Sequence, residues 1–225
     1  MNYIMFFTLF IICSLVKIKY KNKRNLHMLQ QNLYNENNRY LKWVFSNFKL
    51  FFDIDIFLVV IALIGFLITY DINSFSIIFI LVMSAICILE GIILRNRIRN
   101  DQQKKPLVIT ARVKRLICTI SILHIIVIAS MYMNIDNYKV VWLSLLIYSL
   151  MIYLNSFVIW VANIINKPIE ALITLKFKIQ AVNKLKNING LKVVGITGSY
   201  GITSSKNILS DKLNVKYNTF PTPKN

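Results

Sequence analysis

Five apolar blocks, separated by polar segments, constrain the fold of this chain more than any other feature of its sequence. Hydrophobic residues make up 56% of its 225 residues, and its mean hydropathy is +0.55. About 20 consecutive apolar residues cross the hydrocarbon core of a bilayer as a helix. We therefore predict a mainly α, polytopic membrane region over residues 1–165. Its five transmembrane helices are expected near residues 3–16, 54–70, 74–94, 116–135 and 140–165.

The first block, residues 3–16, is short for a transmembrane helix and has two interpretations. A signal peptide carries positive charge before its apolar core. Here no Lys or Arg precedes Lys17, whereas several basic residues follow it. This asymmetry favours a retained membrane anchor whose N-terminus faces outward, with a signal peptide as the alternative.

The basic residues are distributed unevenly along the chain. The formal net charge is +18, but the basic residues flank the apolar blocks instead of lining one folded face, so nucleic-acid binding is excluded. All of them except Lys139 fall in residues 17–49, in residues 95–115 or from residue 167 onward. With five spans these three segments share one side of the membrane. The positive-inside rule then predicts an outward N-terminus, a cytoplasmic C-terminus and the lipid bilayer as partner.

Polar residues inside the apolar blocks are few. Glu90 lies late in its block, which favours a place at the membrane interface or a pair with Arg95 or Arg97 over a transport path. The cysteines are far apart and form no C-x-x-C pair, so we expect packing roles and no metal site. A small transporter is the weakest class of function, because the blocks lack a set of paired polar residues or broken helices.

Residues 166–190 follow the last block and are predicted to form a basic amphipathic linker helix. Pro168 suits the first turn of this helix, and Gly190 suits its end. Apolar positions can face lipid or protein, while lysines can reach phospholipid headgroups. A plain linker helix packed on a further domain is an equally compatible interpretation.

Residues 191–225 carry the one motif that points to chemistry. A β-branched run, residues 191–197, leads through glycines and hydroxyl residues into a predicted helix at 203–213 and a second predicted strand at 215–220. Such loops hold phosphate, because glycines let backbone N–H groups turn toward an anion at a helix N-terminus. Ile202 stands where a phosphate-binding loop places its lysine, and an ordinary glycine turn remains the alternative.

The sequence of residues 193–207 resembles the ATP-binding loop of the Mur ligases, T-G-x-x-G-K-T/S-S/T. The likeness is strongest to a membrane-anchored form of the branch that adds D-alanyl-D-alanine to UDP-linked muramyl tripeptide, and it extends to residues 166–170 and 220–225. The resemblance implies ATP and Mg²⁺ as cofactors, a UDP-linked muramyl peptide as partner of a full-length form, and the bacterial plasma membrane as location. The residues that it places along the ATP phosphates are Thr197, Gly198, Ser199, Gly201, Thr203 and Ser204, with Thr203 also a ligand of Mg²⁺.

Two departures from this family shape the functional expectation. Ile202 replaces the family's lysine, and family members continue for several hundred residues beyond the position matching Asn225. We therefore expect the N-terminal portion of a Mur-ligase-like protein, with a truncated ATP-binding unit at 191–225, no assigned catalytic residue and no ligase activity of its own. The alternative is a non-catalytic membrane protein that recruits or regulates an envelope-synthesis partner.

Overall fold

The computed structural model describes residues 2–35, 39–47, 55–71, 77–100, 106–134 and 136–222. Within these ranges every regular element is a helix, which confirms the predicted mainly α class. The chain divides into a helical unit, Met1–Ile173, and a C-terminal unit, Thr174–Asn225. The helices are α1 (Asn2–Gln31), α2 (Leu41–Ser46), α3 (Asp55–Asp71), α4 (Ile77–Asn100), α5 (Ala111–Met133), α6 (Tyr138–Tyr153), α7 (Asn155–Lys186) and α8 (Ile202–Asn214).

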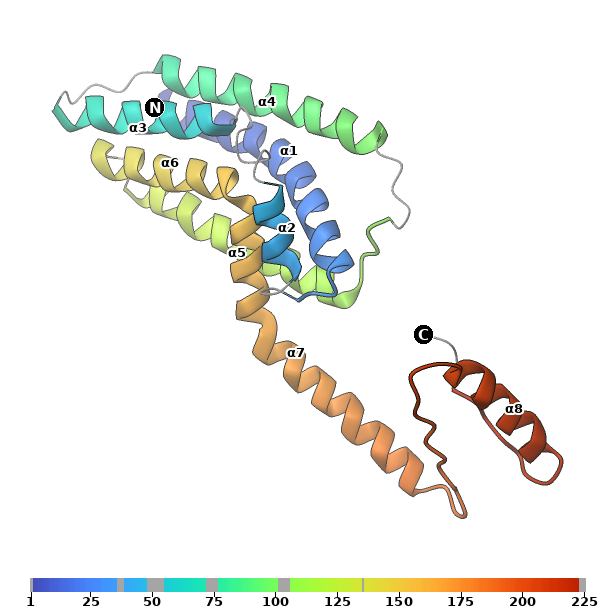
Figure 1. The fold of residues 1–225 in the computed structure, drawn as a ribbon. Coiled ribbons are helices and arrows are strands. Elements are labelled where there is room, and N and C mark those ends of the chain that lie inside the picture. The colour runs from blue at the N-terminus through green and yellow to red at the C-terminus, as the bar shows by residue number, and fades with distance from the viewer. Residues whose placement is uncertain are drawn as a thin grey trace. The chain divides into compact units, whose positions relative to one another are not determined.

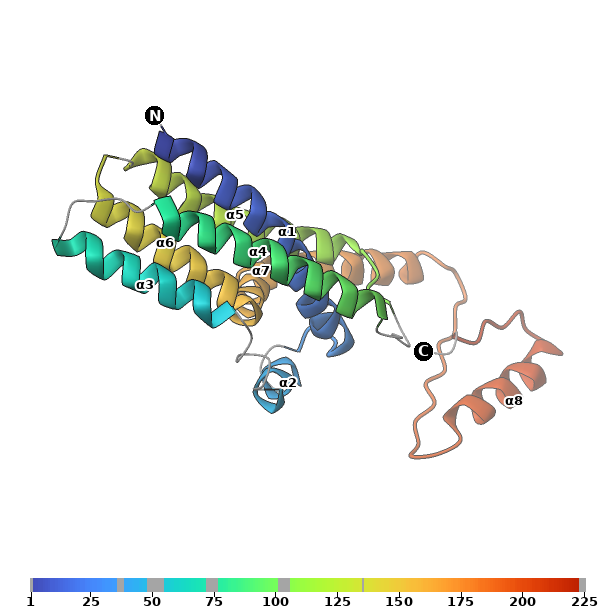
Figure 2. The same cartoon turned by 90° about the horizontal axis from the view of Figure 1, so that it is seen from above.

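Five helices of the helical unit, α1, α3, α4, α5 and α6, run side by side (Figures 1 and 2). Within this bundle α1 packs mainly on α4, and α6 packs on both α3 and α5. The start of α1, the end of α3 and the start of α4 lie at one end of the bundle, together with the end of α5 and the start of α6. The chain therefore passes back and forth along the bundle, as expected for a polytopic membrane protein.

Local sequence explains where two of these helices begin. The side chain of Thr110 accepts a hydrogen bond from the N–H of Val113 at 3.3 Å, which caps α5. Asn137 caps α6 in the same way, accepting from the N–H of Val140 at 3.4 Å. Such caps satisfy donors that a helix leaves unpaired in its first turn.

Two apolar clusters fill the helical unit. The first joins α1, α3, α4, α6 and the end of α5, and it includes the fully buried Trp142. A Cβ built on Gly65 of α3 would overlap the Trp142 ring, so only glycine allows this close approach. The second cluster joins the C-terminal half of α1 with α2, the start of α5 and the start of α7.

The outer surface of the bundle is largely apolar. Large side chains on three different helices are exposed, among them Leu67 at 57%, Ile78 at 72% and Ile126 at 60%. A contiguous apolar exterior of this kind is typical of a surface that faces lipid. Three helices, α4, α5 and α7, are long and apolar enough to cross a membrane. The apolar helices α3 and α6 are shorter, at 17 and 16 residues.

The five predicted spans therefore need correction. The span predicted at 140–165 is not one helix, because α6 ends at Tyr153 and α7 begins at Asn155. The span predicted at 3–16 is only the first half of α1, which continues to Gln31. Pro168, predicted to lie in the first turn of a linker helix, lies well inside α7. Apolar length alone located the blocks but missed a break that no glycine or proline marks.

The α/β unit predicted at 191–225 is also corrected. The strands expected at 191–197 and 215–220 are irregular, and none of the described residues forms a strand. A strand needs a partner for its backbone groups, and a segment below about 40 residues buries too little surface to hold a sheet together. The helix expected at 203–213 is present as α8.

Candidate functional site

The predicted phosphate loop leads directly into α8. Gly201 occupies the N-cap position with φ of 72°, a left-handed conformation that glycine adopts without strain. The first bond of the helix runs from the N–H of Ser205 to the carbonyl of Gly201 at 2.9 Å. Since the preceding N–H groups have no partner inside the helix, the start of α8 presents donors that suit an anion.

All six residues that the resemblance assigns to ATP are exposed. Thr203 and Ser204 lie in the first turn of α8, beside the donors described above. Thr197, Gly198 and Ser199 lie in the irregular segment before it, and nothing lies within 4 Å of a Cβ built on Gly201. The backbone therefore has room for a phosphate, and Thr203 offers one hydroxyl to a metal ion that the phosphate would carry.

Ile202 is the weak point of this loop. Its side chain is 43% exposed at the position where the resembled family has a lysine. A hydrogen bond from a charged donor contributes roughly 1.5–3 kcal/mol, and isoleucine offers none. The loop thus keeps the backbone features of a phosphate site but lacks its cation.

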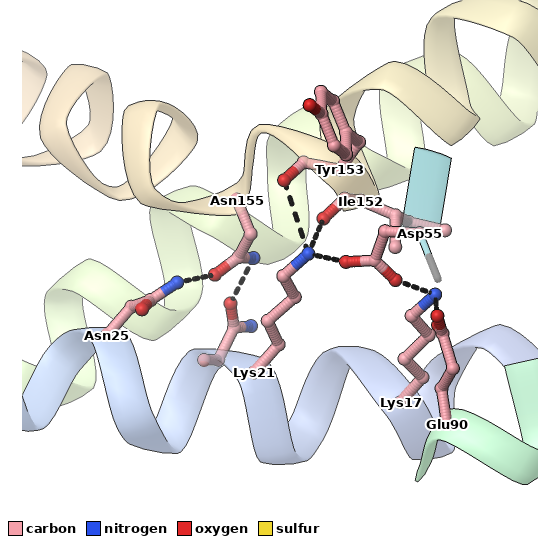
Figure 3. A network of polar contacts seen from close by, with 9 residues as sticks. Lys17, Lys21, Asn25, Asp55, Glu90, Ile152, Tyr153 and Asn155 are labelled. Carbon is pink, nitrogen blue, oxygen red and sulfur yellow. Dashed lines mark hydrogen bonds and ion pairs between the residues drawn. The ribbon is translucent and has the colours of Figure 1, made fainter. Parts of the chain in front are cut away.

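A second candidate site lies inside the helical unit, where four charged side chains meet (Figure 3). Lys17 of α1 forms ion pairs with Asp55 of α3 and with Glu90 of α4. Lys21, one turn further along α1, pairs with the other carboxylate oxygen of Asp55. Lys17 is 0% exposed, Asp55 3% and Glu90 5%. The charges balance, two positive against two negative, which is the condition for holding them away from water.

The positions of these charges follow from their helices. Asp55 is the first residue of α3, where the positive end of the helix dipole stabilises a carboxylate. A Cβ on Gly91 would lie 3.4 Å from Val16 and 3.6 Å from the backbone N of Lys17. Glycine at this position therefore lets α1 approach α4 closely, and this brings Lys17 to Glu90.

The break between α6 and α7 completes the cluster. Because α6 ends at Tyr153, the carbonyls of Ile152 and Tyr153 lie in its last turn, where helix carbonyls take partners from outside the helix. The Nζ atom of Lys21 donates to the carbonyls of Ile152 at 2.8 Å and Tyr153 at 3.2 Å. A cation at the negative end of a helix dipole stabilises that end. Lys21 therefore joins the charge cluster to the broken helix.

Amides extend the polar contacts along α1. Asn155, the first residue of α7, accepts from Nδ2 of Asn25 at 2.7 Å and donates to Oδ1 of Asn22 at 2.7 Å. In the opposite direction, the hydroxyls of Ser14 and Tyr148 lie 2.7 Å apart. Polar contacts thus recur along the buried face of α1 from Ser14 to Asn25, over about 16 Å at 1.5 Å per residue. We call the contacts of this face the α1 polar track.

Sequence reasoning missed the α1 polar track. Lys17 and Lys21 were expected in a basic segment that is either a surface helix on anionic lipid or a solvated linker, whereas the structure buries Lys17 in ion pairs with Asp55 and Glu90. Glu90 was expected at the membrane interface or in a pair with Arg95 or Arg97, and it pairs with Lys17 instead. The structure also removes the stated objection to a transporter, because paired polar residues and a broken helix are both present. A signal was available in the spacing of Ser14, Lys17, Lys21 and Asn25, which falls on one helical face.

Comparison with known protein families, with curated proteins and with solved structures found no match to this chain. The function must therefore be argued from the two sites themselves. The phosphate loop rests on exposed backbone, whereas the charge cluster rests on buried side chains.

Proposed function

We propose that this chain is the N-terminal, membrane-anchoring portion of a Mur-ligase-like protein of the bacterial plasma membrane. The helical unit is the anchor, crossing the bilayer several times with its C-terminus in the cytoplasm. Residues 191–222 supply a phosphate loop for ATP with its Mg²⁺, and the full-length form acts on a UDP-linked muramyl peptide. The chain itself is a weak binder of nucleotide and not a catalyst, because Ile202 replaces the loop lysine.

One observation carries this proposal: the glycine loop ends in a left-handed Gly201 that caps an exposed helix N-terminus. Phosphate oxygens are bound by such N–H groups together with the partial positive charge of the helix. The hydroxyls of Thr203 and Ser204 are exposed beside these donors. An apolar exterior on the helical unit supports the membrane-anchoring role.

The test is a gain of nucleotide binding in the full chain. The variant Ile202→Lys restores the missing cation and is expected to tighten binding of fluorescent ATP with Mg²⁺ by roughly 10-fold or more, the equivalent of a charged hydrogen bond. The variant Ile208→Lys is a matched control, because it adds the same charge at an exposed position of α8, 57% accessible, beyond the first turn. Equal affinities for the two variants would refute the phosphate loop.

A further control removes the loop conformation. Gly201→Val places a β-branched residue at φ of 72°, which such residues strongly disfavour. This change is expected to abolish the gain that Ile202→Lys produces. Persistence of tight binding in the double variant would show that nucleotide binds elsewhere.

A second candidate function is a non-catalytic membrane protein that recruits or regulates an envelope-synthesis partner. The α1 polar track favours it, because a simple anchor needs only apolar surface, whereas buried charges require a defined helix arrangement. The two functions predict different effects in cells that produce the chain. A change in the pool of UDP-linked muramyl peptides that survives Gly201→Val and is lost with Lys17→Met would favour the second function over the first.

A further inference from the structure

The C-terminal half of α7 is a highly exposed helical surface. Residues 174–186, here called the α7 tail, lie in the C-terminal unit, and every residue from Thr174 to Lys186 is exposed. Large apolar side chains are among the exposed ones, including Leu175 at 51%, Phe177 at 64% and Ile179 at 51%. Apolar side chains this accessible on a helix indicate a surface that something covers.

The charge of the α7 tail narrows the class of partner. Lys176, Lys178, Lys184 and Lys186 lie in these 13 residues, and the segment contains no Asp or Glu. Four positive charges without compensation repel a second copy of the same helix. Lysines attract an anionic surface, and the exposed apolar side chains need an apolar layer beneath that surface. A bilayer containing acidic phospholipids offers both.

The spacing of the apolar residues supports the same partner. Leu172, Leu175, Ile179 and Val182 recur at intervals of three, four and three residues, which places them along one stripe of the helix. Lysine side chains next to such a stripe can extend their charged ends to headgroups while their stems lie on apolar surface. The stripe and the lysines together fit a helix that lies in the headgroup region.

We propose that the α7 tail lies on the bilayer surface and binds acidic phospholipid headgroups. This inference rests on the proposed membrane-anchoring role of the helical unit, which tethers α7 near a bilayer. It goes beyond that role by assigning a lipid class to a named segment. Binding there keeps the segment that follows, residues 191–222, close to the membrane.

The experiment uses the full chain in lipid nanodiscs. A polarity-sensitive fluorophore is attached at Ile179→Cys in a Cys118→Ser background, because Cys118 is the exposed native cysteine whereas Cys13 and Cys87 are buried. Discs of phosphatidylcholine alone are compared with discs containing 30% phosphatidylglycerol. We expect the fluorescence emission to shift to the blue in the anionic discs. This shift is expected to disappear in 0.5 M salt, where charges are screened over a few ångströms. A label at Tyr200→Cys, a residue 96% exposed outside α7, is expected to remain solvent-like in both discs.

Charge variants make the test quantitative. Replacing Lys176 and Lys178 by Gln is expected to lower the ratio of bound to unbound tail roughly 30-fold, from the usual attraction of two lysines to an anionic surface. Replacing Lys212 and Lys216 by Gln changes the net charge equally outside α7 and is expected to leave the ratio unchanged. Equal effects of the two pairs would overturn the proposal.

Other outcomes separate the possible failures. A label that is shielded equally in neutral and anionic discs, and only when a disc holds two chains, would overturn the proposal in favour of a contact between copies. A solvent-like label in every disc would overturn it while leaving the membrane-anchoring role intact. A chain that does not enter discs at all would refute the membrane-anchoring role and this inference with it.

Discussion

Removing Lys17 tests the α1 polar track most directly. In the variant Lys17→Met the side chain keeps a similar length but loses its charge. Asp55 retains its contact with Lys21, whereas Glu90 loses its ion-pair partner among the described residues while remaining 5% exposed. Breaking a buried pair by removing one partner costs about 3–5 kcal/mol, because the other charge is left uncompensated. Since whole domains are stable by about 5–15 kcal/mol, this loss is large.

The double variant Lys17→Met/Glu90→Leu separates charge balance from packing. It removes one positive and one negative group and leaves the neutral pair of Lys21 and Asp55. Replacing a whole buried pair by apolar residues is often neutral or stabilising, so we expect the double variant to be more stable than Lys17→Met alone. The non-additivity, expressed as a coupling free energy, is expected at about 2–3 kcal/mol.

The assay is reversible unfolding of the full chain in mixed micelles, with SDS as denaturant and helical circular dichroism as the signal. Lys19→Met is the matched control, because Lys19 carries the same charge two residues away and is exposed. Its effect is expected within about 0.5 kcal/mol, as for other surface substitutions. A Lys17→Met variant as stable as the Lys19→Met control, or strictly additive single variants, would refute the assignment of a buried ion-pair cluster.

Three other substitutions probe the remaining contacts of the helical unit. Gly65→Val is expected to destabilise the fold by about 1–3 kcal/mol through overlap with the Trp142 ring. The same unfolding assay measures this loss. A stability similar to that of the parent chain would contradict the close approach of α3 to α6. Asn155→Ala removes the side chain that accepts from Asn25 and donates to Asn22. We expect the free energy of unfolding to fall by about 1–3 kcal/mol in the same assay. A negligible fall would contradict a structural role for the break between α6 and α7. Burial raises the pKa of the Tyr40 phenol, so its contribution to stability is present below the ordinary tyrosine pKa of about 10 and is lost as pH rises above it. Tyr40→Phe also removes the hydrogen bond to the Ser156 carbonyl, and it is expected to flatten stability between pH 10 and 12 relative to the parent chain; an unchanged slope would refute the assignment.

Local patterns predicted the helices well, because apolar run length and helix caps act within one element. The predicted span at 74–94 overlaps α4 from Ile77 onward, with residues 74–76 outside the described residues, and the one at 116–135 overlaps most of α5. The break after Tyr153 could not be predicted in this way, because its contacts come from a distant part of the chain: Lys21 of α1 donates to the Ile152 carbonyl, and Asn25 of α1 donates to Asn155. The strands at 191–197 and 215–220 failed for a related reason, since β-propensity is realised only where a partner strand exists.

Of the two candidate sites, one consists of residues adjacent in the sequence and the other of residues far apart in it. The phosphate loop could be proposed from the sequence because its features, glycines and hydroxyls at the start of a helix, are contiguous. Lys17 and Glu90 are 73 positions apart in the sequence. They meet only because α1 approaches α4 closely at Gly91. Basic residues near the end of an apolar block are ordinarily flanking charges, and that rule misplaced Lys17.

The two sites also differ in what a substitution does to the fold. Ile202 is exposed at the start of α8, so a substitution there is expected to leave helix packing unaffected and, under the proposed function, to change the affinity for phosphate. A charge lost from the α1 polar track, in contrast, leaves its partner uncompensated inside the bundle and destabilises the arrangement of α1, α3 and α4. Loss of the loop lysine is therefore compatible with an intact helical unit. An activity of this chain that is insensitive to residue 202 would therefore favour the second proposed function, which depends on the helical unit, over the phosphate loop.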